Sequence, residues 1–224
     1  MPRSAKQTRP QVVCVLADNS GSMAGDKANA ATQGIREMIM ACQSRGPSGP
    51  DRSYFKLLLI RFGDVAEVDP AGDMTPVRQI DPDSITIAGD GGQTNITDAL
   101  QVTLERLRPY MRSLELHPER AEYPVPIVIL FSDGEHNQRA LPQPVADEIK
   151  RLALDGEPVV IAAAGVAIDG DPDEATLRAI ASPDCYVPIT NAAVLDRFIS
   201  SVGSSGASRA KDVAAVIRNV KWTR

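Results

Sequence analysis

The sequence predicts an α/β fold: a doubly wound, mostly parallel central sheet with one antiparallel edge strand and helices on both faces. Segments typical of strands and of helices alternate along the chain, the pattern of a parallel sheet whose strands are joined by helices. Two apolar runs rich in Val and Ile, at 12–17 and 127–131, each stop at an acidic turn, as buried strands with a site at their ends do. Aromatic residues make up only 4% of the 224 residues, so aliphatic side chains must build the core.

The first helix and the strand pair after it follow from spacing and turn length. Residues 26–43 are good helix formers, and a Gly/Pro-rich stretch at 45–50 ends the predicted helix. Its apolar side chains recur at the spacing of one buried helical face, at Ile35, Met38, Ile39 and Cys42. Residues 55–62 are the next predicted strand, and a very short link separates them from 65–68. Because such a link permits only a hairpin, this pair supplies the antiparallel edge strand.

A long loop comes next. Residues 69–95 are predicted to form a loop with one short strand at 85–87, and they end in a glycine-rich stretch at 91–95. Loops of that length in a compact domain are usually functional or disordered. Thr97 is the expected N-cap of a helix over 98–111.

The alternation continues to the carboxyl-terminal segment. After a polar, proline-bearing connector, we expect strand, helix, strand, helix, short strand and helix, at 127–131, 145–154, 158–164, 173–180, 186–187 and 192–201. Residues 200–208 are expected to be flexible because Ser and Gly dominate them. Val213, Ile217 and Val220 lie on one face of a final helix, and such a stripe usually packs on its own domain.

The two ends of the chain differ in charge from the body. Residues 1–10 carry +3 and residues 204–224 carry +4, so the net charge of −5 leaves −12 for the body between them. The predicted organisation is a basic amino-terminal extension at 1–10, one domain at 11–201, and a Ser/Gly linker with a basic amphipathic segment at 202–224. An acidic body argues against nucleic acid as the main partner. A solvated acidic surface explains most of the charge, and a cation site is compatible with it.

Several features indicate a cytoplasmic protein. The first ten residues contain Arg3, Lys6 and Arg9 but no apolar segment, which argues against a signal peptide. No run reaches the length of a membrane span, so we expect no membrane insertion. The three cysteines are an odd number within predicted strands and a helix, and we expect them to be reduced and packed.

The first predicted strand ends in oxygen-bearing side chains. Asp18, Ser20 and Ser22 follow the apolar run within one tight turn, and Gly21 lets the backbone bend between them. The carboxyl end of a central parallel strand opens into the crevice where α/β proteins bind ligands. Hard oxygen ligands of this kind suit Mg²⁺ or Mn²⁺. The first hypothesis for this turn is therefore a cation site.

Two further motifs complete a known pattern. Thr94 lies in the glycine-rich stretch before a predicted helix, and Asp133 follows the second buried strand. With Asp18-Asn19-Ser20-Gly21-Ser22, they resemble the von Willebrand factor A domain and its metal-ion-dependent adhesion site, over residues 11–200. The resemblance implies a Rossmann-like sheet whose top face holds one divalent cation, usually Mg²⁺, with Mn²⁺ as an alternative. Matched residue by residue, it implies these metal ligands: Asp18, Ser20, Ser22, Thr94 and Asp133.

The chemistry of Mg²⁺ agrees with this ligand set. The ion takes an octahedron of oxygens and sheds its waters reluctantly, so hydroxyls and water-bridged carboxylates suit it. Such a site keeps one position free, and in this family an Asp or Glu of a protein partner fills it. Partner binding is thereby conditional on metal.

Other residues near these motifs are assigned no metal role. Asn19 occupies a variable position of the motif, and Gln93 stands where the family more often has Gly, so the loop geometry is expected to differ there. Asp98 is interpreted as a first-turn acid favoured by the helix dipole. His136 is interpreted as a solvent-exposed loop residue and not as a catalytic base. Turn and cap roles are the plain alternative for the aspartates, serines and threonine as well.

Three functional hypotheses follow. The leading one is a non-enzymatic module that binds an acidic residue of a protein partner through a divalent cation. Within the family it looks most like intracellular bacterial proteins of tellurite resistance and stress response, which are thought to be adaptors beside a protein kinase and a phosphatase. The alternative is a Mg²⁺-dependent phosphoryl-transfer or phosphatase-like enzyme using Asp18 and Asp133, although neither an Asp-x-Asp motif nor a lysine stands at a predicted strand end. The third is a scaffold whose metal site is vestigial.

Overall fold

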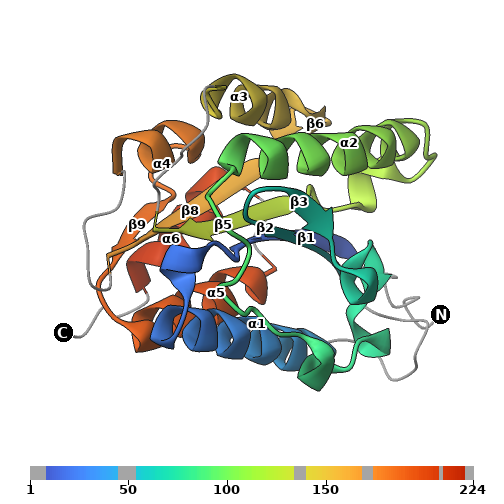
Figure 1. Ribbon diagram of the computed structural model, residues 1–224. Coiled ribbons are helices and arrows are strands. Elements are labelled where there is room, and N and C mark those ends of the chain that lie inside the picture. Colours follow the sequence, from blue (N-terminus) through green and yellow to red (C-terminus); the bar gives the residue numbers. More distant parts are fainter. Residues whose placement is uncertain (1–8, 45–53, 134–139, 168–173, 207–208, 220–224) are drawn as a thin grey trace.

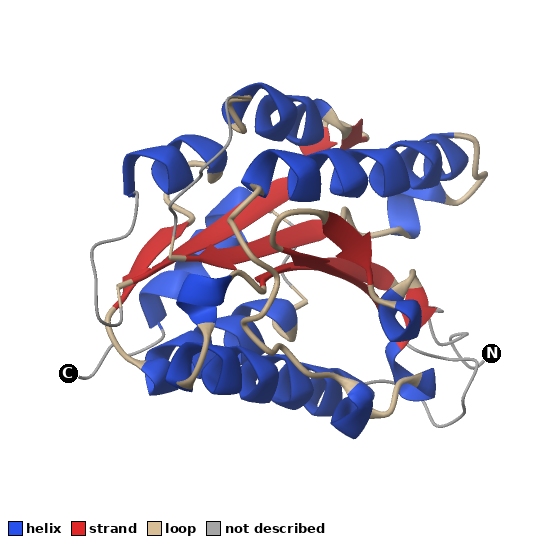
Figure 2. Cartoon of the chain, in the orientation of Figure 1, coloured by secondary structure: helices blue, strands red, loops and turns tan. Residues whose placement is uncertain are grey.

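The computed structural model describes residues 9–44, 54–133, 140–167, 174–206 and 209–219, and it has one large sheet between two layers of helices (Figures 1 and 2). The sheet consists of β1 (Gln11–Asp18), β2 (Phe55–Phe62), β3 (Ala66–Val68), β4 (Thr75–Pro76), β5 (Ile127–Ser132), β8 (Val160–Val166) and β9 (Tyr186–Ile189). Its order is β3-β2-β1-β5-β8-β9, with β4 also paired to β2. Strands β2, β1, β5, β8 and β9 are parallel, and β3 and β4 run antiparallel to β2. The predicted fold class is confirmed.

The helices divide between the two faces of the sheet (Figure 1). One face is covered by α1 (Asp26–Ser44), α5 (Ala192–Gly203) and α6 (Ala210–Asn219), and the other by α2 (Ile96–Glu115), α3 (Gln143–Arg151) and α4 (Glu174–Ile180). Short 3-10 helices occupy η1 (Gly21–Met23), η2 (Pro70–Gly72), η3 (Val77–Gln79), η4 (Pro82–Ser84) and η5 (Arg120–Glu122). This arrangement leaves the two ends of the sheet uncovered by the main helices.

The central strands are buried on both faces. Val13 and Val15 of β1 pack in the cluster with α1, whereas Cys14 and Leu16 pack in the cluster with α2, because successive side chains of a strand point to opposite faces. Every residue of β1 and of β5 is buried, which explains why both read as continuous apolar runs. Polar chemistry can therefore enter only where these strands end.

The predicted hairpin is present, since β3 pairs antiparallel with β2 and Ala66 lies opposite Phe62. The short strand predicted at 85–87 is absent from this described segment. Ile85 and Ile87 are buried, but side chains of α1 satisfy their backbone in place of a ladder. Arg36 Nε donates to Ile85 O at 3.0 Å, and Thr32 Oγ1 accepts from Ile87 N at 2.9 Å. The apolar pair therefore packs as loop.

The start of α2 corrects the predicted cap. The N-cap is Asn95, whose Oδ1 accepts from Asp98 N at 3.1 Å. Thr97 lies inside the first turn, and its hydroxyl donates to Ala140 O at 2.6 Å. The helix also continues past the predicted end at 111, to Glu115, with Pro109 inside it. A cap depends on which side chain reaches the free N–H groups, and Asn is at least as good as Thr there.

A small hairpin follows α3 where the sequence predicted more helix. The helix ends at Arg151, and β6 (Ala153–Leu154) pairs with β7 (Glu157–Pro158). The connecting residues Asp155 and Gly156 have φ values of 49° and 84°, the left-handed conformation that Asp-Gly supplies in tight hairpin turns. Because this turn redirects the chain, β8 begins at Val160 and not at 158.

The carboxyl-terminal helix packs on the sheet. Val213, Ala214 and Ile217 of α6 are buried in the same core cluster as α1 and α5, in agreement with the expected packing on its own domain. Helix α5 extends to Gly203, so part of the stretch expected to be flexible is helical. Val220, the third residue of the predicted stripe, lies outside the described residues.

The cysteines are packed as expected. Cys14, Cys42 and Cys185 are free and buried, and burial raises the pKa of the Cys14 thiol far above its usual range and that of Cys185 to about 11. No helix within the described ranges is long and apolar enough to cross a membrane.

Candidate functional site

Asp18 is the last residue of β1 and lies at the centre of the sheet edge. Its side chain is completely buried, and both of its oxygens accept hydrogen bonds. Oδ1 accepts from Ser20 N at 2.8 Å, and Oδ2 accepts from Ser132 Oγ at 2.5 Å. Because Ser132 ends the neighbouring strand β5, the carboxylate joins the ends of the two central strands.

The charge on Asp18 is costly in this position. Burial raises the pKa of Asp18 to about 6, although the hydrogen bonds from Ser132 and Ser20 lower it, and the charge of Asp133 raises it further. A buried carboxylate beside a second carboxylate needs a compensating cation to remain ionised. The electrostatics of this edge therefore favour a bound positive charge.

The two serines of the first motif lie together in and before η1. Ser20 is buried and Ser22 is exposed, and their Oγ atoms are 3.2 Å apart. Ser20 has extended backbone and caps η1 without a side-chain hydrogen bond to it. Its hydroxyl is thus turned toward Ser22 and away from a cap role, which makes the two hydroxyls a pair of neutral oxygen donors.

Asp133 follows β5 and is nearly buried. Lys27, in the first turn of α1, places its Nζ 3.3 Å from Asp133 Oδ2. The other oxygen, Oδ1, is buried and has no hydrogen-bond partner among the described residues. Buried polar atoms are rarely left without a partner, and those that are often mark the place of an ion or water.

Thr94 is held in the second loop, which is latched to the first. It is 2% exposed and lies just before α2. Two residues before Thr94, Gly92 O accepts a hydrogen bond from Gly21 N at 2.9 Å. Gly21 is the residue between the two serines. This bond joins the serine turn, residues 20–22, to the threonine loop, residues 88–94.

Asn19 makes most of the other hydrogen bonds between these two loops, a role that the sequence did not reveal. Its Oδ1 accepts from Ala88 N and Gly89 N, both at 2.8 Å, and its Nδ2 donates to Asp90 Oδ1 at 2.9 Å. Its backbone O also accepts from Gly91 N at 2.7 Å. An asparagine amide can accept and donate at once, and that property was the only signal in the sequence.

Glycine is required where the loops touch. A Cβ on Gly63 would collide with the backbone carbonyl of Gly91. Gly92 has a φ of 80°, and a Cβ there would collide with the carboxylate of Asp64. Asp64 in turn accepts from Gln93 N at 2.8 Å, which fixes the backbone at the position where the family more often has Gly.

Most of the chain matches one known sequence family. Residues 13–196 match the family model of the von Willebrand factor type A domain. The chain belongs to this family. The match covers most of β1, all of β5 and the chain from Asp18 to Asp133, in agreement with the extent of the predicted resemblance.

Solved structures share the von Willebrand factor A fold. Proximal thread matrix protein 1 from the mussel byssus superposes with a TM-score of 0.60 at 19% identity, over 88% of this chain and 48% of that chain. The same mussel protein with a zinc-occupied MIDAS motif gives 0.61 at 20% identity, over 90% and 47%. The pilus adhesin SpaC from Lactobacillus rhamnosus GG gives 0.57 at 15% identity, over 93% and 31%.

These likenesses concern the fold. This chain spans about half the length of the mussel protein, which it covers to 48%, and less of the adhesin. A search of curated proteins found no significant match.

The structure brings the predicted residues together to different degrees. Asp18 and Ser20 are in direct contact, Ser22 joins them through Ser20, and Asp133 lies close enough to Asp18 to raise its pKa. The link to Thr94 is indirect, because only its loop is joined to the serines, by the bond from Gly21 N to Gly92 O two residues before it.

Asp98 and His136 were predicted to have no metal role. Asp98 lies in the first turn of α2, as predicted, and its Oδ2 accepts from Ala66 N at 2.7 Å. It thus ties α2 to the edge hairpin. His136 lies outside the described residues, as do Gly134 and Glu135.

The donor set fits Mg²⁺ better than a softer metal. Within the described parts of the chain, no cluster of three or more His, Cys, Asp or Glu side chains could hold a metal ion. The site offers two carboxylates with serine and threonine hydroxyls, and oxygen-only sets of this kind suit Mg²⁺ or Mn²⁺. The atom that a cation would satisfy most directly is Asp133 Oδ1, which has no hydrogen-bond partner in the part of the chain that the structure describes.

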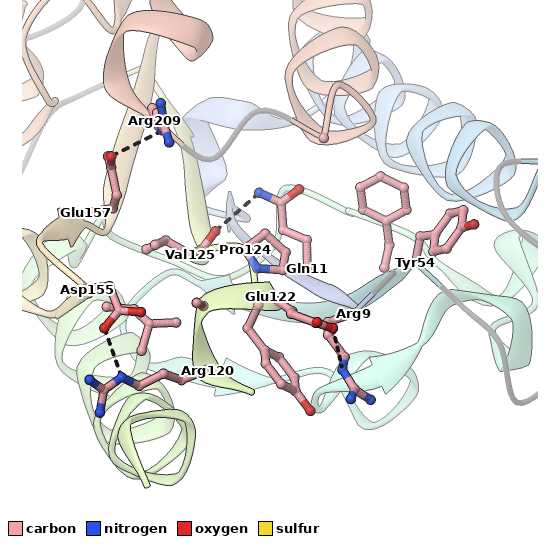
Figure 3. Close-up of a pocket in the computed structure, with 15 residues that line it drawn as sticks. Arg9, Gln11, Tyr54, Arg120, Glu122, Pro124, Val125, Asp155, Glu157 and Arg209 are labelled. Carbon is pink, nitrogen blue, oxygen red and sulfur yellow. Dashed lines mark hydrogen bonds and ion pairs between the residues drawn. The ribbon is translucent and has the colours of Figure 1, made fainter. Parts of the chain in front are cut away.

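A hollow of about 570 Å³ lies at the opposite edge of the sheet, where the strands begin (Figure 3). Gln11, the first residue of β1, and Val125, just before β5, are part of its lining. Its charged side chains are mutually paired, because Arg120 Nε lies 2.9 Å from Asp155 Oδ1 and Arg209 Nε 3.2 Å from Glu157 Oε1. None of the predicted site residues lines it.

Proposed function

We propose that this chain is a metal-dependent protein-interaction module whose site is formed by Asp18, Ser20, Ser22, Thr94 and Asp133, with Mg²⁺ as the resident ion and Mn²⁺ as an alternative. One observation carries the proposal. Asp133 presents a buried oxygen with no partner among the described residues, beside the buried carboxylate of Asp18. A divalent cation satisfies both groups, because each carboxylate then faces a positive charge.

Each side chain has a separate task in this proposal. Asp18 and Asp133 supply charge, and the hydroxyls supply neutral oxygens. Ser132 holds Asp18 in place through the 2.5 Å hydrogen bond, so it positions a ligand without being one. A bound cation would offer Lewis acidity to an anionic group.

The outer side of the site is open to a partner. Ser22, Gly92 and Gln93 are exposed around the buried carboxylates, so a ligand position can face solvent. We propose that an Asp or Glu side chain of a protein partner fills it, because carboxylate oxygens are ligands that Mg²⁺ and Mn²⁺ prefer. The zinc-occupied MIDAS motif of the mussel protein and the adhesin role of SpaC are compatible with such binding.

We further propose that the module acts without catalysis. Phosphoryl chemistry needs a nucleophile or a positioned lysine besides the two aspartates that would hold Mg²⁺, and neither an Asp-x-Asp motif nor a lysine directly follows β1 or β5 in the sequence. We expect that the protein with Mg²⁺ leaves the hydrolysis rate of p-nitrophenyl phosphate at its background value. Metal-dependent turnover lost in Asp18→Ala would instead support the phosphoryl-transfer alternative.

The finer assignment concerns cellular context. We propose a cytoplasmic bacterial adaptor in tellurite-resistance or stress-response signalling, with a kinase or phosphatase system as partner. It rests on overall sequence resemblance and on the three buried, free thiols, which suit a reducing compartment. The domain proposed for this role spans 11–201, with the basic segments at 1–10 and 202–224 outside it.

A metal titration and a pull-down test the proposal. The double variant Ser20→Ala/Ser22→Ala should lose Mg²⁺ binding by calorimetry, while the control Ser84→Ala/Ser113→Ala, two exposed hydroxyls elsewhere, should retain it. Proteins recovered by wild type with Mg²⁺, and lost with chelator and with the double variant, would identify the partner. Equal recovery in all three conditions would contradict metal-gated binding.

A further inference from the structure

Lys27 occupies an unusual position at the edge of the proposed site. It lies in the first turn of α1, directly after Asp26. The amino terminus of a helix is electropositive, so a lysine there is disfavoured and an acid is preferred. The structure shows an interaction that offsets this disadvantage, the ion pair of Lys27 with the Asp133 carboxylate.

The Lys27–Asp133 pair differs from the other ion pairs of the described residues. Its two side chains are only 12% and 11% exposed. In every other ion pair between described residues, at least one side chain is 39% or more exposed. Exposed pairs are screened by solvent and contribute little, whereas a pair withdrawn from water interacts more strongly.

The pair is also incomplete. The ammonium contacts Oδ2 at 3.3 Å, and Oδ1 remains buried without a partner among the described residues. Lys27 carries one positive charge, while Asp18 and Asp133 carry two negative charges when ionised. The lysine therefore neutralises the site only in part and leaves a place for a stronger cation.

We propose that Lys27 is a tethered cation that competes with the divalent metal for Asp133. This inference rests on the proposed function, because it assumes that Asp133 is a metal ligand. In the metal-free protein the ammonium limits repulsion between Asp18 and Asp133. When metal binds, the ammonium loses its pairing with Asp133, and the affinity for metal is lower than the oxygen ligands alone would give.

The competition has a consequence for charge. Two ionised aspartates and a divalent cation sum to zero, so the lysine gives the loaded site a net positive charge. A positive site favours an anionic ligand over a neutral one. The same side chain that weakens metal binding thereby supports the choice of a carboxylate partner.

Titration of the full chain with metal alone tests the proposal. Lys27→Met removes the charge and keeps most of the apolar stem, and Lys211→Met is the matched control because Lys211 is exposed on α6. We expect Lys27→Met to bind Mg²⁺ by calorimetry, and Mn²⁺ by electron paramagnetic resonance, about tenfold more tightly than wild type. Lys211→Met should bind as wild type does.

Thermal unfolding supplies a second readout. In chelator, Lys27→Met should unfold at a lower temperature than wild type, because two acidic side chains then lie together without a cation. Saturating Mg²⁺ should remove that difference. A lysine with a merely structural role would lower the unfolding temperature in both conditions and would not tighten metal binding.

The outcomes separate this inference from the proposed function. If wild type binds metal and Lys27→Met binds it equally or more weakly, the competition is refuted and the metal site stands. If both proteins are folded by circular dichroism and neither binds Mg²⁺ or Mn²⁺, the proposed function fails and the competition with it. Lys27→Gln serves as a second neutral variant if the methionine impairs folding, with the same expected direction.

Discussion

The two ends of the central sheet hold charged residues in opposite ways. At the carboxyl end of β1 and β5, the acidic side chains are buried and outnumber their cation, and Asp133 has an oxygen without a partner among the described residues. At the amino end, most charged side chains that line the hollow in Figure 3 are about half exposed, and they form ion pairs, such as Arg209 at 50% with Glu157 at 43%. The charges of the hollow are therefore balanced in pairs, whereas the acidic side chains at the carboxyl end outnumber their cation.

This difference shows what locates the site. Volume alone does not point to it, because hollows of about 570 Å³ and 630 Å³ lie elsewhere, the first at the amino end and the second lined by Ser182 and Tyr186 beside β9. Burial of charge points to the carboxyl end, because buried charges without compensation persist only when something offsets them. Substitutions at the carboxyl end should therefore change metal binding, whereas substitutions at the amino end should leave it unaffected.

The largest effect is expected for Asp18→Asn. The amide keeps an oxygen for Ser20 N but loses the charge, so Mg²⁺ affinity should fall about a hundredfold or more. In chelator, its unfolding temperature should equal or exceed that of wild type, because a buried charge is removed. Calorimetry and thermal unfolding measure the two effects. A marked loss of stability in chelator would show that Asp18 is primarily structural.

The pH dependence of metal binding comes next in size. The pKa of Asp18 is raised to about 6, chiefly by burial, and metal binds the ionised form. Affinity for Mg²⁺ should therefore be constant above that value and fall as pH drops, about tenfold by one pH unit below it.

Metal-free stability should change in the opposite direction. The raised pKa of Asp18 in the folded state means that its contribution is fully present below the unfolded value of about 4 and is lost as pH rises through about 6. The comparison of wild type with Asp18→Asn in chelator isolates this contribution. Identical pH profiles for the two proteins would contradict the assigned pKa.

A smaller effect is expected for Asn19→Ala. The change leaves Ala88 N and Gly89 N without their acceptor, which should lower the free energy of unfolding by about 1–3 kcal/mol. Because the threonine loop loosens, Mg²⁺ affinity should fall by less than in Asp18→Asn. Urea unfolding and calorimetry measure both effects, with the exposed Asn29→Ala as control. Unchanged affinity would mean that these hydrogen bonds are not needed for the site.

The smallest effect is expected at the amino end. Glu157→Gln breaks an exposed pair with Arg209, so the free energy of unfolding should change by about 0.5 kcal/mol or less. Metal binding should be unaffected. Altered Mg²⁺ affinity in this variant would show that the two ends communicate and would undo the contrast drawn between them.

Local patterns predicted the fold and the edge of the sheet where the proposed site lies. Continuous apolar runs revealed β1 and β5, and the acidic turns after them placed Asp18 and Asp133 at one edge, because neighbouring parallel strands end together. The cap at Asn95 and the hairpin turn at Asp155 were missed although each has a local signature, since alternative residues nearby had comparable propensities.

Other features could not be read from the sequence, because they depend on partners far along the chain. Asn19 bonds to residues about 70 positions away, at Ala88 and Gly89. Lys27 has no sequence feature that connects it to Asp133, 106 residues later. Long-range polar contacts of this kind become visible only when the fold brings the loops together.

The bonds between the loops also allow the choice of partner to change independently of the affinity for the ion. The backbone around the metal ligands is fixed internally, by Gly21 to Gly92 and by Asp64 to Gln93, while the side chain of Gln93 is exposed beside them. Exposed positions of the rim can therefore vary without disturbing the ligands. A single scaffold of this design could be redirected to new partners by a few surface substitutions, with the affinity for the ion left as it is.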